Sequence, residues 1–483
     1  MKNLKRKPFL TNLIILIILL GTGNPIFAAV YTATNEAEIQ SYTNTLTAGD
    51  TLQVQSGAYS MRTWRIQNIH GNSSAWITIE PVGGSVSITG NDNQNVVNMD
   101  NISYVIFRDF EITYSGTTSA IDGIKFNAGT TSEYIIIEHC HIHDITGVGI
   151  NSKASELQWF WVLWNHIHDT DDTGEGMYLG HHDGSGIVHD ALISHNWVHD
   201  THGSQGDGIE IKRSCYSVSI EDNVVYNTNN YPGIIVYRTD RADLSLQNVI
   251  KNNVIWNAGE GIFAVAEADI YNNIIFNSSY GINTRNYSGW GMRDLRLYNN
   301  TVYSCSVTCM RLSDWNVATG VMEVINNAVY QDSVSDSALQ APAGIGPATI
   351  LNNYYYGTSA ISAGFTPGNP PPNEFVNPSI IPGSINLYPL STSLLIDSGH
   401  DLSTIFQNDF NTTRRPHGTS WDVGAYEYSA PVNPGWQVQE GFKPAPLPPV
   451  VPINFDLFVI VASILPIYSL FTYVSRLIFN PHF

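Results

Sequence analysis

The hexapeptide Trp164-Asn165-His166-Ile167-His168-Asp169 recurs along this 483-residue chain, and its recurrence indicates how the chain folds. It returns as His195-Asn196-Trp197-Val198-His199-Asp200 and as Asp222-Asn223-Val224-Val225-Tyr226-Asn227. Further copies are centred on Asn253, Asn273, Asn300, Asn327 and Asn353. The central asparagine advances by 20 to 31 residues from one copy to the next. A period of this size is typical of a solenoid in which each repeat is one supersecondary unit.

Short alternating stretches around these asparagines indicate β-strands rather than helices. Examples are Gly208-Ile209-Glu210-Ile211-Lys212 and Ser217-Val218-Ser219-Ile220-Glu221, in which every second side chain is apolar. Such alternation is typical of a strand with one buried face, and Gly, Asn and Asp interrupt the strands where turns are needed. Two or three such strands per repeat predict an all-β chain wound as a parallel β-helix with triangular coils.

The recurring asparagine has a physical reason. A tight turn leaves backbone groups unpaired, and an Asn amide can hydrogen-bond its own turn and the amide of the next coil. We therefore expect a ladder of stacked asparagines from Asn165 to Asn353, with Cys140 in the same position one coil earlier.

These features resemble the right-handed parallel β-helix repeats of the pectin-lyase-like superfamily. The resemblance covers residues 30–428. It includes an opening coil, Gly49-Asp50-Thr51-Leu52-Gln53-Val54, and a closing segment, Arg414-Arg415-Pro416 followed by Asp422-Val423-Gly424-Ala425-Tyr426-Glu427. It implies a right-handed parallel β-helix. It implies much less about activity, because the superfamily holds lyases, hydrolases, epimerases and tail-spike adhesins.

Both ends of the chain carry membrane-directed patterns. Four basic residues precede an apolar run at residues 13–20, and Ala28-Ala29 offer a small-residue cleavage site, as in a secretory signal peptide. Residues 457–475 contain no charge and are long enough to cross a bilayer core. The sequence thus predicts a signal peptide (1–29), the β-helix (30–428), a Pro-rich linker (429–455) and a transmembrane helix (456–479). The alternative for the last part is a buried C-terminal helix.

This layout predicts an exported protein held at the cell surface by a single C-terminal helix. Its formal net charge of −20 argues against nucleic acid and anionic lipid as main partners. The same charge would repel an acidic polysaccharide unless bound Ca²⁺ or a local basic cluster intervenes. The four cysteines form no CxxC pair, so we expect buried thiols, with a small Cys305–Cys309 disulfide loop as the alternative.

Alternation also identifies the side chains that leave the core. In the strand after each Gly, two outward columns bring Tyr178, Glu210, Lys212 and Tyr237 into one patch, with Lys153 beside it. We expect these side chains to lie on an open strand face and to contribute little to folding. The loops before the strands add the acids Asp171, Asp172, Glu175 and Asp207.

This combination fits cleavage of a uronate polysaccharide by β-elimination. That reaction needs a base for the C5 proton, a cation for the carboxylate and an acid for the leaving oxygen. The candidate catalytic residues are Lys212, Arg213 and Arg238. The candidate Ca²⁺ ligands are Glu175, Asp207 and Glu210, because carboxylates suit this hard ion. The candidate substrate-binding residues are Lys153, Tyr178, His181, His182 and Tyr237.

Three other interpretations of this face stay open. A glycoside hydrolase would use two or three of the same carboxylates a few ångströms apart. A non-catalytic cell-surface stalk or adhesin would use the aromatic and Asn-rich faces to bind glycans. The charges could also be ordinary ion pairs on a solvated strand face.

Histidines form a second group. His143, His168 and His199 share one repeat position, and each precedes an aspartate. Later repeats place Tyr226, Trp256 and Phe276 at that position, which indicates a column of stacked rings. Metal binding and a catalytic use of His181 or His182 are the alternatives.

Overall fold

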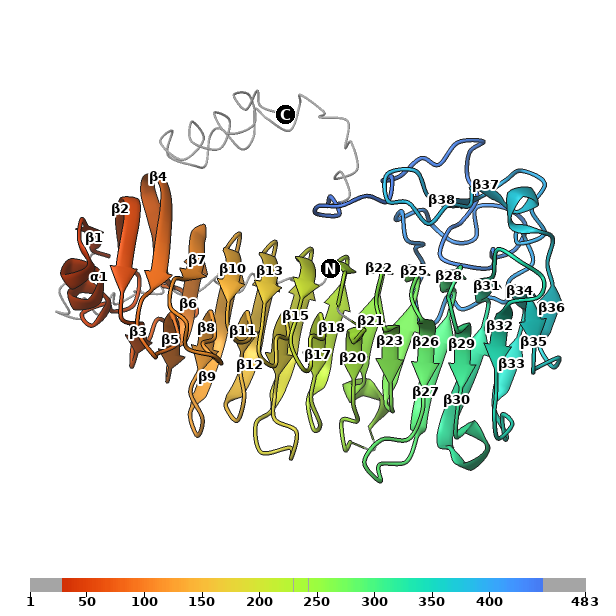
Figure 1. Ribbon diagram of the computed structural model, residues 1–483, viewed down its shortest axis with the longest axis horizontal. Helices are drawn as coiled ribbons and strands as arrows, with labels where there is room; N and C mark the ends of the chain where they lie inside the picture. Colours follow the sequence, from red (N-terminus) through yellow and green to blue (C-terminus); the bar gives the residue numbers. More distant parts are fainter. Residues whose placement is uncertain (1–27, 229, 242, 446–483) are drawn as a thin grey trace, which may run out of the picture. The chain divides into compact units, whose positions relative to one another are not determined.

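The structure is a computed structural model that describes residues 28–445 except 229 and 242, and these residues form a parallel β-solenoid (Figure 1). The all-β parallel β-helix predicted from the repeats is therefore confirmed. Nearly all of the predicted signal peptide and the whole predicted transmembrane helix lie outside the described residues. Among the described residues, no helix is both long and apolar enough to cross a membrane.

One sheet of the solenoid contains 12 short parallel strands, one from each coil. Its strands are β3 (Trp64–Gln67), β5 (Val97–Asp100), β8 (Ile124–Phe126), β11 (Ile150–Asn151), β14 (Met177–Leu179), β17 (Ile209–Ile211), β20 (Pro232–Val236), β23 (Glu260–Ala264), β26 (Tyr280–Thr284), β29 (Thr308–Leu312), β32 (Ser337–Gln340) and β35 (Thr358–Ser359).

The second sheet contains 24 strands, which run as two parallel columns joined at the asparagine turn. They are β1 (Val30–Ala33), β2 (Thr51–Met61), β4 (Ile77–Gly90), β6 (Ser103–Arg108), β7 (Phe110–Tyr114), β9 (Thr131–Glu138), β10 (His141–Ile145), β12 (Glu156–Leu163), β13 (His166–Thr170), β15 (Val188–Ser194), β16 (Trp197–Thr201), β18 (Tyr216–Glu221), β19 (Val224–Tyr226), β21 (Asn248–Lys251), β22 (Val254–Trp256), β24 (Ala268–Tyr271), β25 (Ile274–Phe276), β27 (Arg293–Tyr298), β28 (Thr301–Tyr303), β30 (Thr319–Ile325), β31 (Ala328–Tyr330), β33 (Thr349–Leu351), β34 (Asn353–Tyr356) and β36 (Phe365–Pro367).

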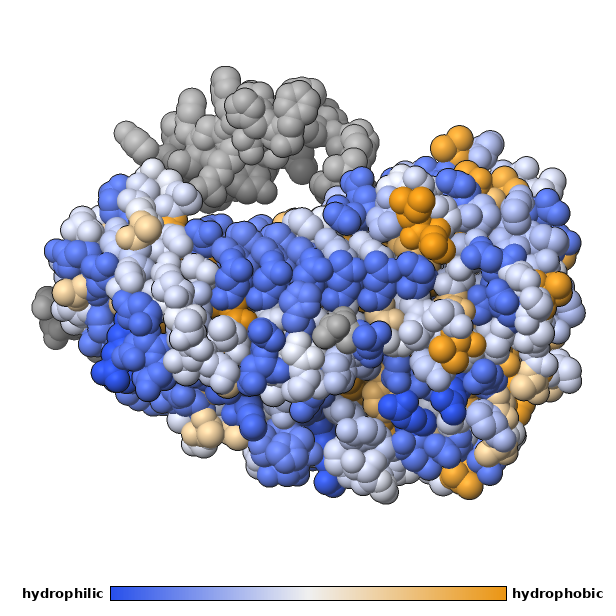
Figure 2. All heavy atoms as spheres, in the orientation of Figure 1, coloured by the Kyte–Doolittle hydropathy of each residue, from blue (hydrophilic) through white to orange (hydrophobic). Residues whose placement is uncertain are grey.

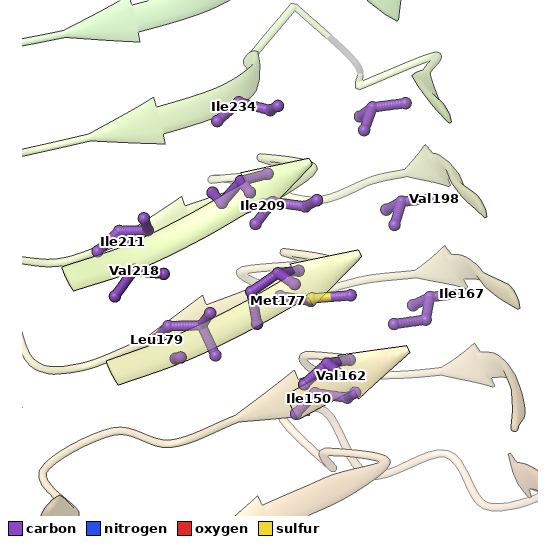
Figure 3. Close-up of a cluster of buried hydrophobic side chains, with 14 of the residues drawn as sticks. Ile150, Val162, Ile167, Met177, Leu179, Val198, Ile209, Ile211, Val218 and Ile234 are labelled. Atoms are coloured by element: carbon purple, nitrogen blue, oxygen red, sulfur yellow. The ribbon is translucent and has the colours of Figure 1, made fainter. Parts of the chain in front are cut away.

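The coils enclose an apolar core, while hydrophilic residues cover much of the surface seen in Figure 2. Ile150, Met177 and Ile209 are register partners on β11, β14 and β17, so their side chains lie above one another inside the coils (Figure 3). All three are fully buried. Each coil thus buries its apolar side chains on those of its neighbours, which is why the repeats are stable only as a stack.

The predicted asparagine ladder is confirmed. The backbone N–H of Asn196 donates to Asn223 Oδ1 at 2.8 Å. The Asn223 amide in turn donates to the Ile193 carbonyl at 2.9 Å and to Asn253 Oδ1 at 3.0 Å. The same bonds recur from Asn165 to Asn353, and the Cys140 backbone N–H donates to Asn165 Oδ1. The side chains therefore satisfy the buried backbone groups of every turn in the series.

A short helix at the N-terminal end of the solenoid was not expected from the repeats. Helix α1 (Glu36–Thr43) begins at Asn35, whose side chain accepts from the Glu38 backbone N–H. It buries Ile39 and Thr43 beside the first coil. Such a cap covers core residues that have no preceding coil to pack against.

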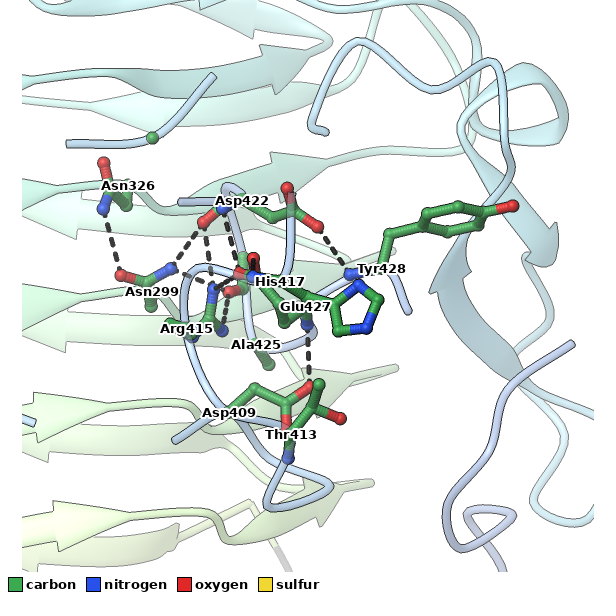
Figure 4. A network of polar contacts seen from close by, with 12 residues as sticks. Asn299, Asn326, Asp409, Thr413, Arg415, His417, Asp422, Ala425, Glu427 and Tyr428 are labelled. Carbon is green, nitrogen blue, oxygen red and sulfur yellow. Dashed lines mark hydrogen bonds and ion pairs between the residues drawn. The ribbon is translucent and has the colours of Figure 1, made fainter. Parts of the chain in front are cut away.

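The chain after the last coil packs onto the side of the solenoid. It includes the antiparallel pair β37 (Phe375–Asn377) and β38 (Asn386–Pro389). The buried Arg415 pairs with Glu427 at 3.1 Å and donates to the Gly424 carbonyl at 2.8 Å (Figure 4). Asn299, from a turn of the solenoid, donates to two carbonyls of this closing segment. The segment thereby covers one face of several coils.

The first part of the predicted linker also lies against the solenoid. Val438 is buried, and the buried Lys443 ammonium bonds Asp222 at 2.6 Å and lies 3.6 Å from the Phe410 ring centroid. The four cysteines are buried and free, so the described residues contain no Cys305–Cys309 disulfide.

Candidate functional site

The candidate site lies on the outer face of the 12-stranded sheet. Strands β11, β14, β17 and β20 place Asn151, Tyr178, Glu210 and Ile235 side by side in register. This is the outward column predicted from the alternation. The second column follows the strand ends, where the Lys212 backbone N–H donates to the Leu179 carbonyl.

The expectation that this face is open to solvent was wrong. Tyr178, Glu210 and Lys212 are only 8%, 1% and 5% exposed. Loops of neighbouring coils rise beside the strands, and aromatic residues from one of them cover the face: Tyr287 lies 5.1 Å from the Tyr237 ring and Trp290 lies 5.7 Å from it. The strand alternation shows which side chains leave the core, but it does not show which loops then cover them.

The strands and the loops beside them enclose a pocket of about 370 Å³. That volume suits one or two sugar rings rather than a long open groove. The lining residues come from several coils: Val148, Asn151, Lys153, Thr173, Glu175, Tyr178, His182, Gln205, Lys212, Tyr237, Tyr287 and Trp290.

Three carboxylates meet beside this pocket, and one of them, Glu175, lines it. Glu175, Asp207 and Glu210 are all buried, and one oxygen from each lies within 4.8 Å of the others. Both oxygens of Glu175, Oδ1 of Asp207 and Oε2 of Glu210 accept no hydrogen bond from the described residues. Buried carboxylate oxygens are normally paired, so this cluster has the donor set of a site for a hard cation.

Burial and mutual repulsion perturb all three acids. Burial, followed by the charge of Glu210, raises the pKa of Glu175 to about 7. Burial, Glu210 and Glu175 raise the pKa of Asp207 well above its usual range. Burial also raises the pKa of Glu210, although Lys212 opposes this effect. Three like charges at this separation cannot all ionise without a compensating cation.

Lys212 is the cation nearest to these acids within the described part of the chain. Its ammonium pairs with Glu210 Oε1. The same nitrogen lies 4.2 Å from the Tyr178 ring centroid and 5.4 Å from that of Tyr237. A lysine held between two aromatic faces and a carboxylate has little rotational freedom, so its amine is positioned at the pocket wall.

Three predicted residues do not reach the pocket. Arg213 and Arg238 both pair with Asp240, at 2.6 and 2.7 Å, and neither lines the cavity. His181 pairs with Asp183 instead, while its neighbour His182 does line the pocket. The exposed acids Asp171 and Asp172 stand outside the carboxylate cluster. The structure thus brings together eight of the eleven predicted site residues: Lys153, Glu175, Tyr178, His182, Asp207, Glu210, Lys212 and Tyr237.

Two aromatic residues of the site were missed. Tyr287 and Trp290 belong to a Gly-containing loop, Asn286-Tyr287-Ser288-Gly289-Trp290-Gly291, which folds back on itself through a Tyr287–Trp290 bridge. Large aromatic residues among turn residues are a usable signal, because such residues rarely stay fully exposed. The repeat pattern could not place this loop over Tyr237, since its length differs from those of the other coils.

The stacked column predicted from the histidine positions is confirmed. The rings of His143, His168, His199, Tyr226 and Trp256 stack at centroid separations of 4.3 to 5.3 Å. A second column beside it stacks His141, His166 and Trp197. Burial and the neighbouring histidines lower the pKa of His141 to about 4.

Comparison with known proteins supports the fold. No protein-family model and no curated protein sequence matches the chain. Among solved structures, XylC in complex with xylose shares 10% identity at a TM-score of 0.52, with 86% of this chain and 99% of that chain covered. Pectate lyase Pel9A shares 14% identity at a TM-score of 0.49, with 83% and 96% covered. The alginate lyase AlyGC shares 13% at 0.46, with 72% and 54% covered, so this chain spans about half of that protein.

The stacked parallel strands define the class. The chain is a parallel β-helix protein. At such identities the likeness concerns the fold alone, and the activity has to be argued from the pocket.

Proposed function

We propose that this protein is a polysaccharide lyase that cleaves a uronate chain by Ca²⁺-assisted β-elimination in the pocket around Lys212. The observation that supports this proposal is the cluster of Glu175, Asp207 and Glu210, whose unpartnered buried oxygens lie beside a positioned lysine.

The charges of the cluster favour a divalent cation. Three carboxylates and one ammonium leave two negative charges in a buried site. An ion such as Ca²⁺ would balance them, and six to eight oxygen ligands at about 2.3–2.6 Å are usual for it. The three side chains can supply several of these oxygens, and the substrate carboxylate can supply others. The cation would also answer the objection raised by the net charge of −20.

When bound, the cation would stabilise the negative charge that develops on the substrate carboxylate. The residues of the chain supply the proton transfers. Lys212 would act as the base that removes the C5 proton, because its amine is positioned at the pocket wall. The electron pair left at C5 forms the C4–C5 double bond, and the C4–O bond breaks.

The leaving oxygen then needs a proton. Tyr178 and Tyr237 lie on either side of Lys212, and burial together with Glu210 raises the pKa of both phenols. Both hydroxyls therefore stay protonated and can donate. Lys153 at the rim of the pocket can bind the carboxylate of a neighbouring sugar.

A glycoside hydrolase is the second candidate. The pKa of about 7 for Glu175 suits a general acid, and the three carboxylates lie as close together as retaining glycosidases require. A hydrolase would act without Ca²⁺ and would release a saturated product. A non-catalytic glycan-binding protein would release no product at all.

The test is an assay of the full-length protein on polyuronates such as alginate and pectate. We expect ultraviolet absorbance from an unsaturated uronate, loss of that activity with a chelator, and recovery with Ca²⁺. Lys212→Ala should lower turnover by roughly two to four orders of magnitude. The exposed Asp171→Asn is the matched control and should keep full activity. Saturated reducing ends formed in chelator would favour the hydrolase. Binding without any product would favour the glycan-binding protein.

A further inference from the structure

The two histidine columns on the other sheet contain an arrangement that ring stacking does not explain. His141 and His143 stand two residues apart on β10, so both side chains leave the same face. His168 on β13 is the register partner of His143. Glu111 on β7 is the register partner of His141. Three successive coils therefore bring three imidazoles and one carboxylate to one place on the surface.

The ring nitrogens of these residues converge. His141 Nε2 lies 2.7 Å from His168 Nε2, and His143 Nε2 lies 3.0 Å from Glu111 Oε1. One nitrogen from each of the three histidines lies within 4.8 Å of the others. Stacking alone, as between Tyr226 and Trp256 in the later coils, does not require the polar atoms of the rings to point toward one another.

The opposite nitrogens are held by carboxylates. His143 Nδ1 bonds Asp144 at 2.7 Å, and His168 Nδ1 bonds Asp169 at 2.6 Å. A carboxylate on Nδ1 makes that nitrogen the donor and leaves the Nε2 lone pair free. This is the outer-shell arrangement that orients histidine ligands in metal sites.

His143 lies between two carboxylates. Both of its nitrogens face a carboxylate oxygen, Asp144 on one side and Glu111 on the other. A neutral imidazole can donate to only one of them. A metal ion held jointly by His143 Nε2 and Glu111 Oε1 would satisfy both atoms. The contact between the Nε2 atoms of His141 and His168 lies beside it.

We propose that His141, His143 and His168 form a binding site for a divalent transition-metal ion such as Zn²⁺, with Glu111 as the adjacent carboxylate. Imidazole nitrogens suit zinc, copper and nickel, whereas Ca²⁺ prefers oxygen ligands. The site would thus bind a different class of ion from the pocket, and it stands on a different sheet. Zinc–nitrogen bonds of about 2.0–2.1 Å in tetrahedral geometry separate two ligand nitrogens by roughly 3.3 Å. The rings of His141 and His168 would have to separate only slightly to reach that distance.

The neighbouring coil provides an internal comparison. His199 occupies the next position of the same column, pairs with Asp200 and lies 2.8 Å from His166 through the two Nε2 atoms. In the described part of the chain, no third histidine lies close enough to this pair to complete a group of three metal-ligand atoms. Among the described residues, these coils therefore contain one three-histidine group and one two-histidine pair.

The experiment is a calorimetric titration of chelator-treated full-length protein with Zn²⁺ in the presence of excess Ca²⁺, which occupies oxygen sites. Wild-type protein should bind one ion, and Co²⁺ in place of Zn²⁺ should give the visible absorption of nitrogen-coordinated cobalt. His168→Phe should weaken binding at least 100-fold. A phenyl ring fits this column, because Phe276 already occupies it on β25. The matched control His199→Phe should bind as wild type.

Asp169→Asn provides a second test if His168→Phe does not fold. It leaves all three ligands in place and should weaken binding 10- to 100-fold, because it removes the carboxylate that orients His168 through Nδ1. The proposal is overturned if wild-type protein binds no Zn²⁺, if His168→Phe binds as tightly as wild type, or if His199→Phe loses binding to the same extent. Loss of Zn²⁺ binding in Glu210→Gln, with His168→Phe unaffected, would place the ion at the carboxylates and would overturn it too.

Discussion

The carboxylate cluster makes a quantitative prediction for Glu175→Gln. The pKa of Glu175 rises from an ordinary 4.5 to about 7 on folding. Because each pKa unit corresponds to about 1.4 kcal/mol, this shift corresponds to roughly 3 kcal/mol. The unfolded state loses this proton at lower pH than the folded state. The folded protein therefore loses stability as the pH rises from about 4.5 to about 7, when no cation is present.

Glutamine has the same shape as protonated glutamate and cannot ionise. In a Ca²⁺-free buffer we expect Glu175→Gln to match the wild type near pH 4.5 and to exceed its free energy of unfolding by roughly 3 kcal/mol above pH 7. If the cluster binds Ca²⁺ as proposed, saturating Ca²⁺ should stabilise the wild type and reduce this difference, because an ion that binds only the folded state stabilises it.

The assay is urea denaturation of both proteins across this pH range, with and without Ca²⁺. Differences between the two proteins are compared because Asp409 and Asp422, in the closing segment, also have raised pKa values, of about 6 and 7, that both proteins share. The exposed Asp171→Asn serves as the control and should follow the wild type. Equal pH dependence of wild type and Glu175→Gln would refute the assignment of the pKa shift. Equal stabilisation of both by Ca²⁺ would place the ion elsewhere.

Asn223→Ala removes the acceptor of the Asn196 N–H and one donor to the Ile193 carbonyl, and should lower the unfolding free energy by about 1–3 kcal/mol. An unchanged urea midpoint would contradict the ladder's role. The alternation predicted that Lys212→Ala would not affect folding. Since Glu210 loses its buried partner, we now expect Lys212→Ala to lower the melting temperature measurably. An unchanged melting temperature would show that Glu210 is already neutral. Arg415→Ala should lower the free energy of unfolding by about 3–5 kcal/mol, because Glu427 loses its buried ion-pair partner. Thermal unfolding measures this loss, and a melting temperature equal to that of the wild type would show that the ion pair does not stabilise the closing segment. Full-length protein should resist carbonate extraction from membranes if residues 456–479 span the bilayer, and its release would contradict the predicted anchor.

Much of the solenoid could be predicted because its information is local and repeated. The asparagine at each turn, the Gly at the start of each short strand and the alternation between them follow from backbone hydrogen bonding and side-chain direction. These features predicted the register of Asn151, Tyr178 and Glu210 on neighbouring coils, which the structure confirms. Helix α1 and the closing segment occur once each, so no repeat could indicate where they pack.

The candidate site was predictable only in part, for a related reason. The alternation predicted that Tyr178 and Glu210 point away from the core, and Lys212 follows directly after the end of β17. Burial of these residues depends on Tyr287 and Trp290, which belong to a loop more than two coils further along the chain. Likewise, Arg213 and Arg238 resemble candidate bases in the sequence, but Asp240 engages both of them.

The winding of the chain follows from local patterns: which residues turn, which side chains enter the core and which leave it. These properties depend on neighbours two residues or one coil away, and the same pattern occurs in every repeat. Which outward side chains are covered, and what they contact, depends on tertiary packing. Loops of unequal length, from coils far apart in the sequence, make those contacts, so the unpaired carboxylates of Glu175, Asp207 and Glu210 become a site only when the coils are stacked.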